Sequence, residues 1–544
     1  MDRAEVIVVG AGHNGLICAA YLARAGIDTI LVDARDSVGG CASTEHDLDA
    51  RFNICNCDHG LVRAMPVIDE LDLVGHGLEY LENDVGFVYA FHDDSHPWLQ
   101  FHDVERTLDS IAASHPTQVD GYRRYLDDAL PIAELVVDMA RRVPSAPRFA
   151  AGALSRRGAG VRRLLDWSRR SVDDVFADYF DDWRLTMPAI SIGPTVWGVP
   201  PETPGTGLAA AGYATRHVVK TGRPRGGSGA LTDAICHSFL AAGGVLRCGT
   251  RVAGLEVADG TVTGVRLADG SRLHADVVVA ACDPQRVFVD WVDEVPPAAK
   301  RLVERWRAQP IHDGYESKID AVLTGLPTPR VAERLHATHP GAELLGPTTV
   351  VSPSRAQLVE AFALRDVGRV APEPTLLVNM PSVLDPSMAA PGEHVLSIEV
   401  LFTPYALEGG WPGSSEPARW LELWASTMEP GALDLVDRWR AMTPDRYEAE
   451  FSMHRGHTPA FASSPLHSLL GRDHELTRYR TPISGLYLSG AATFPGAGVF
   501  GASGRNAAAV VRGDLRGTVG RRVAPLRRAA TGVVGAAAAK VGSA

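Results

Sequence analysis

The hydrophobic pattern at the start of the chain predicts a strand, a helix and a second strand. Residues 5–9 form a short, largely apolar run, which is typical of a strand buried on both faces of a parallel sheet. Apolar residues then recur at helical spacing from Leu16 to Ala23, and Gly26 ends this pattern. Residues 27–32 form another apolar run and predict the neighbouring parallel strand.

The turn between the first strand and the helix has the glycine spacing of a dinucleotide-binding loop. Gly10 permits a tight turn, Gly12 lets the backbone approach a pyrophosphate, and Gly15 lets the helix pack closely against the strand. The free N–H groups at the helix start favour phosphate charge. Asp33 ends the second strand, and its carboxylate can accept hydrogen bonds from a ribose diol. This order of elements predicts a dinucleotide site, and the acid disfavours the 2′-phosphate of NADP.

Further strands are expected in the middle and at the end of the chain. Residues 245–284 contain two Asp-Gly turns between apolar runs, which predicts hairpin-linked strands and a last strand that ends near the cofactor. Residues 225–231 are rich in glycine and open a helix, and residues 485–491 form a strand that ends in small residues. The stretches 60–224 and 285–480 must then build the substrate side, and they contain no clean linker or repeat.

Composition and charge exclude several classes of protein. With 45% hydrophobic and 22% charged residues among 544, most of the chain is not disordered. A net charge of −12 argues against a nucleic-acid-binding protein, which needs a basic face. Seven cysteines are too few, and an odd number, for a disulfide scaffold. We see no secretory signal and no apolar run of about 18 residues, so we expect a cytoplasmic protein, and an oligomer is compatible with the sequence.

The segment after the second strand resembles the extended flavin fingerprint of amine oxidases and phytoene dehydrogenases. In this fingerprint an acid is followed by an arginine and then by two glycines, as in Asp33, Ala34, Arg35, Gly39 and Gly40. The resemblance implies that the arginine and the glycine pair flank the phosphates of FAD. It favours FAD over NAD, because NAD dehydrogenases do not usually carry this extension.

The C-terminal segment 494–504 is similar to the closing FAD motif of phytoene-dehydrogenase-type flavoenzymes. The resemblance implies that a helix N-terminus there points at the pyrimidine end of the flavin, where positive partial charge stabilises the reduced anion. It also implies that a backbone group of Val252 pairs with the adenine. A second glycine pattern, at 496–501, is not a second nucleotide site, because no strand ending in an acid follows it.

Residues 13–16, His-Asn-Gly-Leu, are most similar to one branch of the phytoene-dehydrogenase-related proteins, the pyridine nucleotide-disulfide oxidoreductase domain-containing protein 2 branch. Disulfide reduction is not expected, because no two cysteines have the Cys-x-x-Cys or Cys-x4-Cys spacing of a redox-active pair. The family implies an α/β protein in which a Rossmann-like, glutathione-reductase-type FAD domain is braided with a mixed-sheet α+β substrate domain. We assign residues 1–60, 225–290 and 480–515 to the FAD-binding domain, 61–224 and 291–479 to the substrate domain, and 516–544 to a flexible tail.

The expected FAD-binding residues come from both ends of the chain and from its middle. They are Gly10, Gly12, His13, Asn14, Gly15, Asp33, Ala34, Arg35, Gly39, Gly40, Val252, Gly490, Ala491, Gly498, Val499 and Phe500. Among them, His13 occupies a variable position of the loop, and we expect it to make a local contact rather than to act in catalysis.

Lys318 is the candidate catalytic residue. It is one of only four lysines, and it lies in a predicted strand at 315–323. In amine oxidases a strand lysine in this sort of location holds a water against flavin N5, and the resemblance implies the same role here. An ordinary lysine at a strand edge is the alternative.

Cys55, Cys57, Asp58 and His59 lie close together and raise the question of a metal site. A structural zinc site usually needs four ligands in paired spacings, and the sequence has no second cluster. We therefore expect thiols and no metal. A covalent flavin link through cysteine or histidine has no motif to support it.

Residues 141–170 contain nine arginines and one aspartate, with apolar residues between them. Such a basic amphipathic element can make a peripheral contact with an anionic membrane surface. It can also be a solvated face or an oligomer contact, and the sequence leaves these three alternatives open.

The sequence predicts an FAD-dependent oxidoreductase, a dehydrogenase or desaturase that abstracts hydride from a C–H bond of an organic, apolar small molecule. A single Rossmann fingerprint, taken by FAD, leaves no site for NAD(P)H, so electrons should leave to oxygen, a quinone or a partner protein. An FAD-dependent amine oxidase is one alternative. A non-catalytic prenyl- or lipid-binding protein of the same fold is another, although the intact glycine motifs argue against it.

Overall fold

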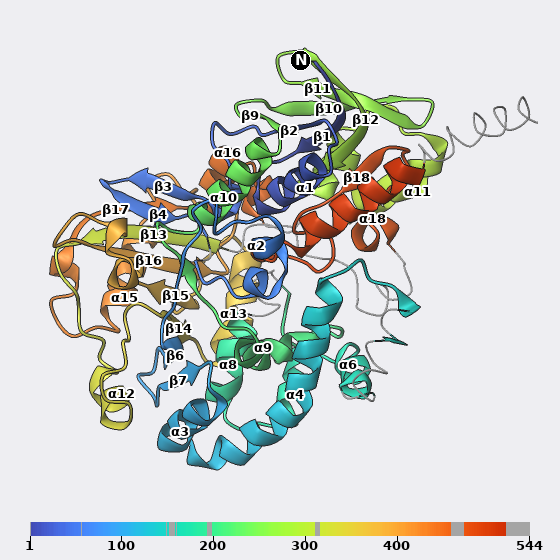
Figure 1. Ribbon diagram of the computed structural model, residues 1–544. Coiled ribbons are helices and arrows are strands. Elements are labelled where there is room, and N and C mark those ends of the chain that lie inside the picture. Colours follow the sequence, from blue (N-terminus) through green and yellow to red (C-terminus); the bar gives the residue numbers. More distant parts are fainter. Residues whose placement is uncertain are drawn as a thin grey trace, which may run out of the picture.

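The predicted strand–helix–strand unit forms the centre of the first of two large sheets (Figure 1). In this computed structural model, β1 (Arg3–Val9) lies parallel to β2 (Thr29–Val32) on one side and to β12 (Arg272–Ala280) on the other. α1 (His13–Arg24) connects β1 to β2. The structure describes residues 2–55, 57–147, 150–151, 158, 160–192, 199–309, 316–457 and 473–517.

Strands from the middle and the end of the chain extend this first sheet. Its order is β10-β11-β12-β1-β2-β9, and β18 pairs with β12. The added strands are β9 (Val245–Arg247), β10 (Val252–Ala258), β11 (Thr261–Leu267) and β18 (Leu486–Leu488). β10, β11 and β12 are antiparallel and are joined at the two Asp-Gly turns, whereas β18, β12, β1, β2 and β9 run parallel.

Helices cover both faces of the first sheet, which explains why Val6 to Val9 of β1 are apolar without alternation. On one face, α1 and α10 (Gly229–Ala241) share a core with Val8. On the other face, Trp306 of α11 (Lys300–Ala308) belongs to a cluster with Ile7. α11 therefore packs on the first sheet, although its residues fall in the range assigned to the substrate domain. The domain boundaries themselves stay a prediction.

The second sheet is mixed, and it contains the strand predicted around Lys318. Its order is β17-β13-β16-β15-β14-β6-β7, in which β14 and β6 are parallel and the other neighbours are antiparallel. The strands are β6 (Val85–Phe91), β7 (Trp98–Phe101), β13 (Glu316–Leu323), β14 (Thr348–Ser352), β15 (Leu376–Asn379), β16 (His394–Leu401) and β17 (Val436–Met442). One face packs on α15 (Glu416–Ala425), where Ile319 and Ile398 join the buried rings of Trp420 and Trp424.

A group of helices packs beside the β6–β7 end of the second sheet, in the lower part of Figure 1. They are α3 (Val104–Ser114), α4 (Val119–Ala140), α6 (Val161–Trp167), α7 (Val172–Ala177), α8 (Trp183–Ser191) and α9 (Gly212–Val218). Their shared core is aromatic and includes the fully buried rings of Trp98, Tyr122, Tyr125, Trp167 and Tyr213.

A short hairpin links the cofactor loops to the second sheet. β3 (Thr44–Asp47) and β4 (Ala50–Asn53) follow the Gly39-Gly40 pair, and Phe52 packs on Val322 and Val395 of the second sheet. Residues 502–517 form the last described helix. The remaining elements are α2 (Val67–Glu70), β5 (Tyr80–Leu81), β8 (Arg223–Pro224), α12 (Ala332–Thr338), α13 (Arg355–Asp366), α14 (Pro381–Leu384), α16 (Pro444–Phe451) and α18 (His474–Thr477).

Candidate active site

A cavity of about 880 Å³ is lined by residues of both sheets. This volume is near the upper end of the usual range for small-molecule sites. The structure brings nearly all of the predicted FAD-binding residues together on its wall. They are Gly10, Gly12, His13, Asn14, Gly15, Asp33, Ala34, Gly39, Gly40, Val252, Gly490, Ala491, Gly498 and Val499. Arg35 and Phe500 are not among its lining residues.

The glycine loop has the shape that a bound pyrophosphate requires. Gly10 has φ +103°, which favours glycine, and a Cβ there would lie 2.8 Å from the carbonyl oxygen of Ala281. A Cβ on Gly15 would lie 1.8 Å from the carbonyl oxygen of Gly10, so the helix and strand touch at this point. A Cβ on Gly12 would meet no atom within 4 Å. The loop is thus tightly packed at its two ends and open toward the cavity at its centre.

Asp33 holds the glycine loop in place at the edge of the cavity. Its Oδ2 accepts a hydrogen bond from Ala11 N at 2.6 Å, and its Oδ1 accepts one from Arg35 N at 2.8 Å. The Arg35 guanidinium turns to the Glu45 carboxylate at 2.6 Å and lies 4.1 Å from the centre of the Phe451 ring. The Arg35 side chain therefore braces the hairpin that follows the double glycine.

The closing motif meets the N-terminal loop at the start of the last helix. Gly504 N donates to Asn14 Oδ1 at 3.4 Å, and Gly490 N donates to Ser503 Oγ at 3.0 Å. His13 lies beside Gly498, and burial of its ring lowers the pKa of the imidazole to about 4. His13 is therefore neutral at pH 7. These contacts, with the open cradle at Gly12, fit a dinucleotide held between the two ends of the chain.

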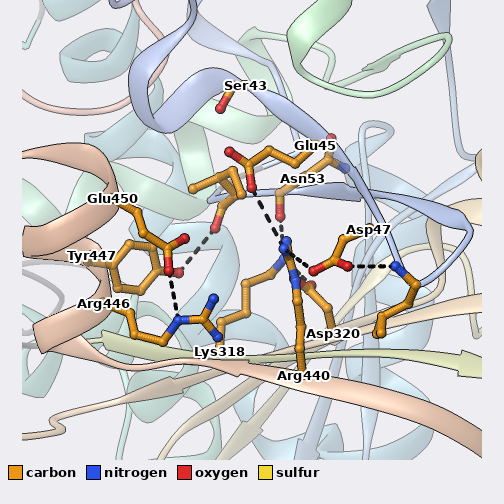
Figure 2. Close-up of polar contacts among 12 residues, drawn as sticks. Ser43, Glu45, Asp47, Asn53, Lys318, Asp320, Arg440, Arg446, Tyr447 and Glu450 are labelled. Carbon is orange, nitrogen blue, oxygen red and sulfur yellow. Dashed lines mark hydrogen bonds and ion pairs between the residues drawn. The ribbon is translucent and has the colours of Figure 1, made fainter. Parts of the chain in front are cut away.

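Lys318 lies in a buried network of charges on β13 (Figure 2). Its ammonium donates to the carbonyl oxygen of Asn53 and to Asp320. Asp320 also accepts a hydrogen bond from Arg440 at 3.1 Å, and Arg440 reaches Asp47 at 2.8 Å. Lys318 is not among the residues that line the cavity. Its role at the flavin stays a prediction.

Two glutamates beside Lys318 do line the cavity, and the sequence analysis missed them. Glu316 lies two positions before Lys318 in β13, and Glu399 of β16 is the cross-strand partner of Lys318. Burial, together with the charge of Glu316, raises the pKa of the Glu399 carboxyl to about 8. A signal was present only for Glu399, which stands among apolar residues of β16, whereas Glu316 begins a strand that also contains Lys318 and Asp320.

The four residues considered as metal ligands are engaged separately. Cys55 hydrogen-bonds with Cys41, and Cys57 lies 3.7 Å from Asn379 Oδ1. Asp58 pairs with Arg223 at 2.8 Å, while the ring nitrogens of His59 contact Tyr80 and Ser228. Among the described residues, no group of three or more His, Cys, Asp or Glu side chains could hold a metal ion. The contact between Cys41 and Cys55 arises from the fold, and their spacing in the sequence does not indicate it.

Residues 15–317 match the family model described as flavin containing amine oxidoreductase. The chain belongs to this family. The match begins at Gly15, the last glycine of the N-terminal loop, and extends through the middle strands of the first sheet to the start of β13. It confirms the FAD-binding superfamily that the fingerprint residues predicted.

Similar proteins within and around this flavin-containing amine oxidoreductase family agree with that assignment. The mouse pyridine nucleotide-disulfide oxidoreductase domain-containing protein 2 is 27% identical, with 94% of each chain covered. The phytoene desaturase (lycopene-forming) of Pseudescherichia vulneris is 26% identical, over 94% of this chain and all of the relative. Among solved structures, wild-type putrescine oxidase bound to putrescine has a TM-score of 0.59 at 16% identity, with 95% and 99% of the two chains covered. At this level of identity, the similarity to putrescine oxidase shows a shared fold and nothing about the substrate.

Together these findings confirm the α/β fold class, the FAD cofactor and the oxidoreductase activity predicted from the sequence. The protein is an FAD-dependent oxidoreductase. The predicted relationship to amine oxidases and phytoene dehydrogenases, including the pyridine nucleotide-disulfide oxidoreductase domain-containing protein 2 branch, is likewise confirmed.

Beyond the cofactor loops, the cavity of this flavoenzyme continues into an apolar region. Its wall there is formed by side chains of β6, β15 and the lower helices, namely Phe87, Val136, Met139, Leu164, Ile192, Leu208 and Leu377. Val136 and Met139 lie on α4 and Leu164 lies on α6, so the predicted Arg-rich segment adjoins this region. No helix among the described residues is long and apolar enough to cross a membrane.

Several arginines of the 141–170 segment are already paired within the protein. Arg163 contacts Asp128 at 3.0 Å, and Arg170 contacts Asp178 at 2.5 Å. Three others, Arg142, Arg162 and Arg169, are exposed. Arg148, Arg156 and Arg157 lie outside the described residues, as does the predicted tail from residue 518 onward.

Proposed function

We propose that the protein dehydrogenates an apolar organic molecule by transferring hydride from a C–H bond to FAD. The observation that carries this proposal is that one cavity joins the cofactor loops to a wall of aliphatic and aromatic side chains. An apolar molecule gains free energy when it leaves water for such a wall. A polar group placed against these aliphatic and aromatic side chains would lose its hydrogen bonds with water.

The chain supports this reaction mainly by holding and orienting. The Gly10–Gly15 loop and the residues around Gly498 would hold FAD, which supplies a two-electron acceptor for hydride. Neutral His13 adds no charge beside the closing motif. The aromatic and aliphatic wall would keep water away from the reacting C–H bond.

Amine oxidation is a second candidate, favoured by the two carboxyl groups on the cavity wall. Glu316 and Glu399 would suit a substrate nitrogen better than a pure hydrocarbon. The two candidates can be separated by mixing the purified flavoprotein anaerobically with fractions of a cell extract. We expect a lipid fraction to bleach the flavin, and bleaching only by water-soluble amines would favour the second candidate.

The protein should contain tightly bound FAD and should not accept electrons from NAD(P)H. We expect about one FAD per chain after purification, since the predicted loop residues line one cavity. NADH or NADPH at micromolar concentration should leave the flavin spectrum unchanged under anaerobic conditions. A colourless protein would contradict the proposed function and favour a lipid-binding role. Rapid bleaching by NADH would show that the protein has a nicotinamide site as well.

We also propose that the 141–170 segment makes a peripheral contact at the cytoplasmic surface of a membrane. An apolar substrate dissolved in a bilayer could then enter the nearby apolar region of the cavity without crossing water. Support comes from α4 and α6, which contribute cavity-lining side chains, while the exposed Arg142 follows α4 and the exposed Arg162 lies on α6. Each arginine near an anionic surface contributes about 1 kcal/mol, and salt screens this attraction.

We expect the protein to co-sediment with anionic vesicles at low salt and to be released at high salt. Changing Arg142, Arg162 and Arg169 to Gln should weaken binding roughly 100-fold, from about 3 kcal/mol of lost attraction. A matched triple change of the exposed residues Arg24, Arg301 and Arg307 should have little effect. If the wild type ignores phosphatidylserine vesicles at low salt, a solvated face or an oligomer contact explains the segment instead.

A further inference from the structure

Glu316 and Glu399 face the same side of the second sheet. In the antiparallel register of β13 and β16, Lys318 is opposite Glu399, and Glu316 is opposite Leu401. Side chains alternate along a strand, so Glu316 and Lys318 share a face, and Glu399 is diagonal to Glu316 on that face. Diagonal neighbours across a sheet are within reach of long side chains. Both glutamates line the cavity.

This pair of glutamates lies next to the cofactor loops rather than at the far apolar end. Cys55 connects the two regions. Its thiol contacts Cys41, the residue that directly follows the Gly39-Gly40 pair. The same thiol interacts electrostatically with Glu316 and Glu399. The backbone shows the same proximity, since Ile54 N donates to Ser43 O at 3.1 Å and so extends the β3–β4 hairpin toward the double glycine.

Two ionised carboxylates in this position would repel each other. Both glutamates are largely withdrawn from water, where a second negative charge is costly. The charged and titratable groups that face the pair come from three elements: Lys318 and Asp320 on β13, Cys55, Cys57 and Asp58 after β4, and Tyr447 on α16. Three cations pair with these groups: Lys318 and Arg440 bind Asp320, and Arg223 binds Asp58.

We propose that Glu316 and Glu399 hold one proton between them and accept the proton that the substrate loses when its hydride goes to FAD. This proposal rests on the dehydrogenation proposed above and names its proton acceptor. A substrate of the form H–C–X–H, with X a carbon, nitrogen or oxygen atom, loses hydride to FAD and a proton to the carboxylate. The C=X bond forms, and the pair then holds two protons. When oxygen or a quinone takes two electrons and a proton from the reduced flavin, the pair would give its extra proton to the reduced acceptor or to water, and one shared proton would remain.

The carboxyl pair can be tested without a known substrate, because its protonation should change how the midpoint potential of the bound flavin depends on pH. Reduction adds negative charge to the flavin, which favours protonation of a nearby carboxylate. Above the pH at which Glu399 loses its proton, about 8, each reduction should carry one additional proton onto the pair. The midpoint potential should therefore fall more steeply with pH above about 8. The added slope is about 30 mV per pH unit, the value of a tenfold change for a two-electron couple.

Potentiometric titration of the purified holoenzyme from about pH 6 to 10 measures this slope. Glu399→Gln should remove the break, whereas Glu399→Asp should keep it, because the aspartate still titrates. Glu316→Gln should move the break to lower pH, since Glu399 then has no like charge beside it. Glu408→Gln, on an exposed residue, is the matched control and should leave the profile unchanged.

The possible results separate this inference from the proposed function. A wild-type profile with bound flavin and no break overturns the carboxyl pair and leaves the flavoenzyme in place. A break that survives in Glu399→Gln also overturns it, because another group then titrates. A purified protein without flavin has no midpoint potential at all, and in that case both proposals fall.

Discussion

Gly12→Val should yield a folded protein that has lost its flavin. A side chain at Gly12 would meet no protein atom within 4 Å, so it would project into the cavity, where the pyrophosphate must come close. We expect the affinity for FAD to fall at least roughly 100-fold, or about 2.8 kcal/mol. Flavin absorbance of the purified variant, and titration of the FAD-free form with FAD, measure this loss.

Gly15→Ala is the informative contrast to Gly12→Val. Its Cβ would lie 1.8 Å from the carbonyl oxygen of Gly10, so α1 would have to move away from β1. We expect this variant to be destabilised even without FAD, by roughly 1–3 kcal/mol, as other overpacked sites are. The melting temperature of FAD-free Gly12→Val should stay close to that of the FAD-free wild type. A yellow Gly12→Val protein would show that FAD does not pass this glycine.

The sequence predicted those parts of the site whose functional residues lie close together along the chain. A strand, three glycines, a helix and an acid follow one another within the first 33 residues, and each feature needs only its neighbours to have meaning. The closing motif at 494–504 is also contiguous. If both motifs bind the same cofactor, they must lie side by side, and the hydrogen bond between Gly504 and Asn14 shows that they do.

Glu316 and Glu399 could not be paired from the sequence because register decides their contact. They are 83 positions apart, and only the antiparallel pairing of β13 with β16 puts them on one face. A slip of one residue would turn Glu399 to the opposite face. The same reason hid the contact between Cys41 and Cys55, which depends on the hairpin between them.

Lys318 shows how rarity in the composition can indicate an important residue without indicating its task. The lysine is fixed by Asn53 and Asp320, and Asp320 also binds Arg440 from β17. These partners come from distant parts of the chain, and each strand alone gives no sign of them. In the structure these buried ion pairs and hydrogen bonds link the hairpin β3–β4 to the second sheet.

Asp320→Ala should be the most destabilising single change in this network. The Asp320 side chain is fully buried and accepts hydrogen bonds from both Lys318 and Arg440. Removing it leaves two cations without their shared partner in a region withdrawn from water. Breaking a buried ion pair in this way costs about 3–5 kcal/mol. Urea unfolding at saturating FAD, which keeps the contribution of the cofactor constant, measures the difference from the wild type.

Lys318→Met should cost less than Asp320→Ala, because Asp320 keeps Arg440 as a partner and the methionine side chain fills similar space. A smaller loss of stability for Asp320→Ala than for Lys318→Met would contradict the shared role of the carboxylate.

Lys318→Met also tests the catalytic role that the sequence predicted for Lys318. A lysine that holds a water against the flavin would change the rate at which air reoxidises the photoreduced cofactor. The structure places the ammonium between β13 and the hairpin β3–β4, and Lys318 does not line the cavity. We therefore expect Lys318→Met to lower stability. The reoxidation rate should stay within about twofold of the wild type, which corresponds to about 0.4 kcal/mol in barrier height.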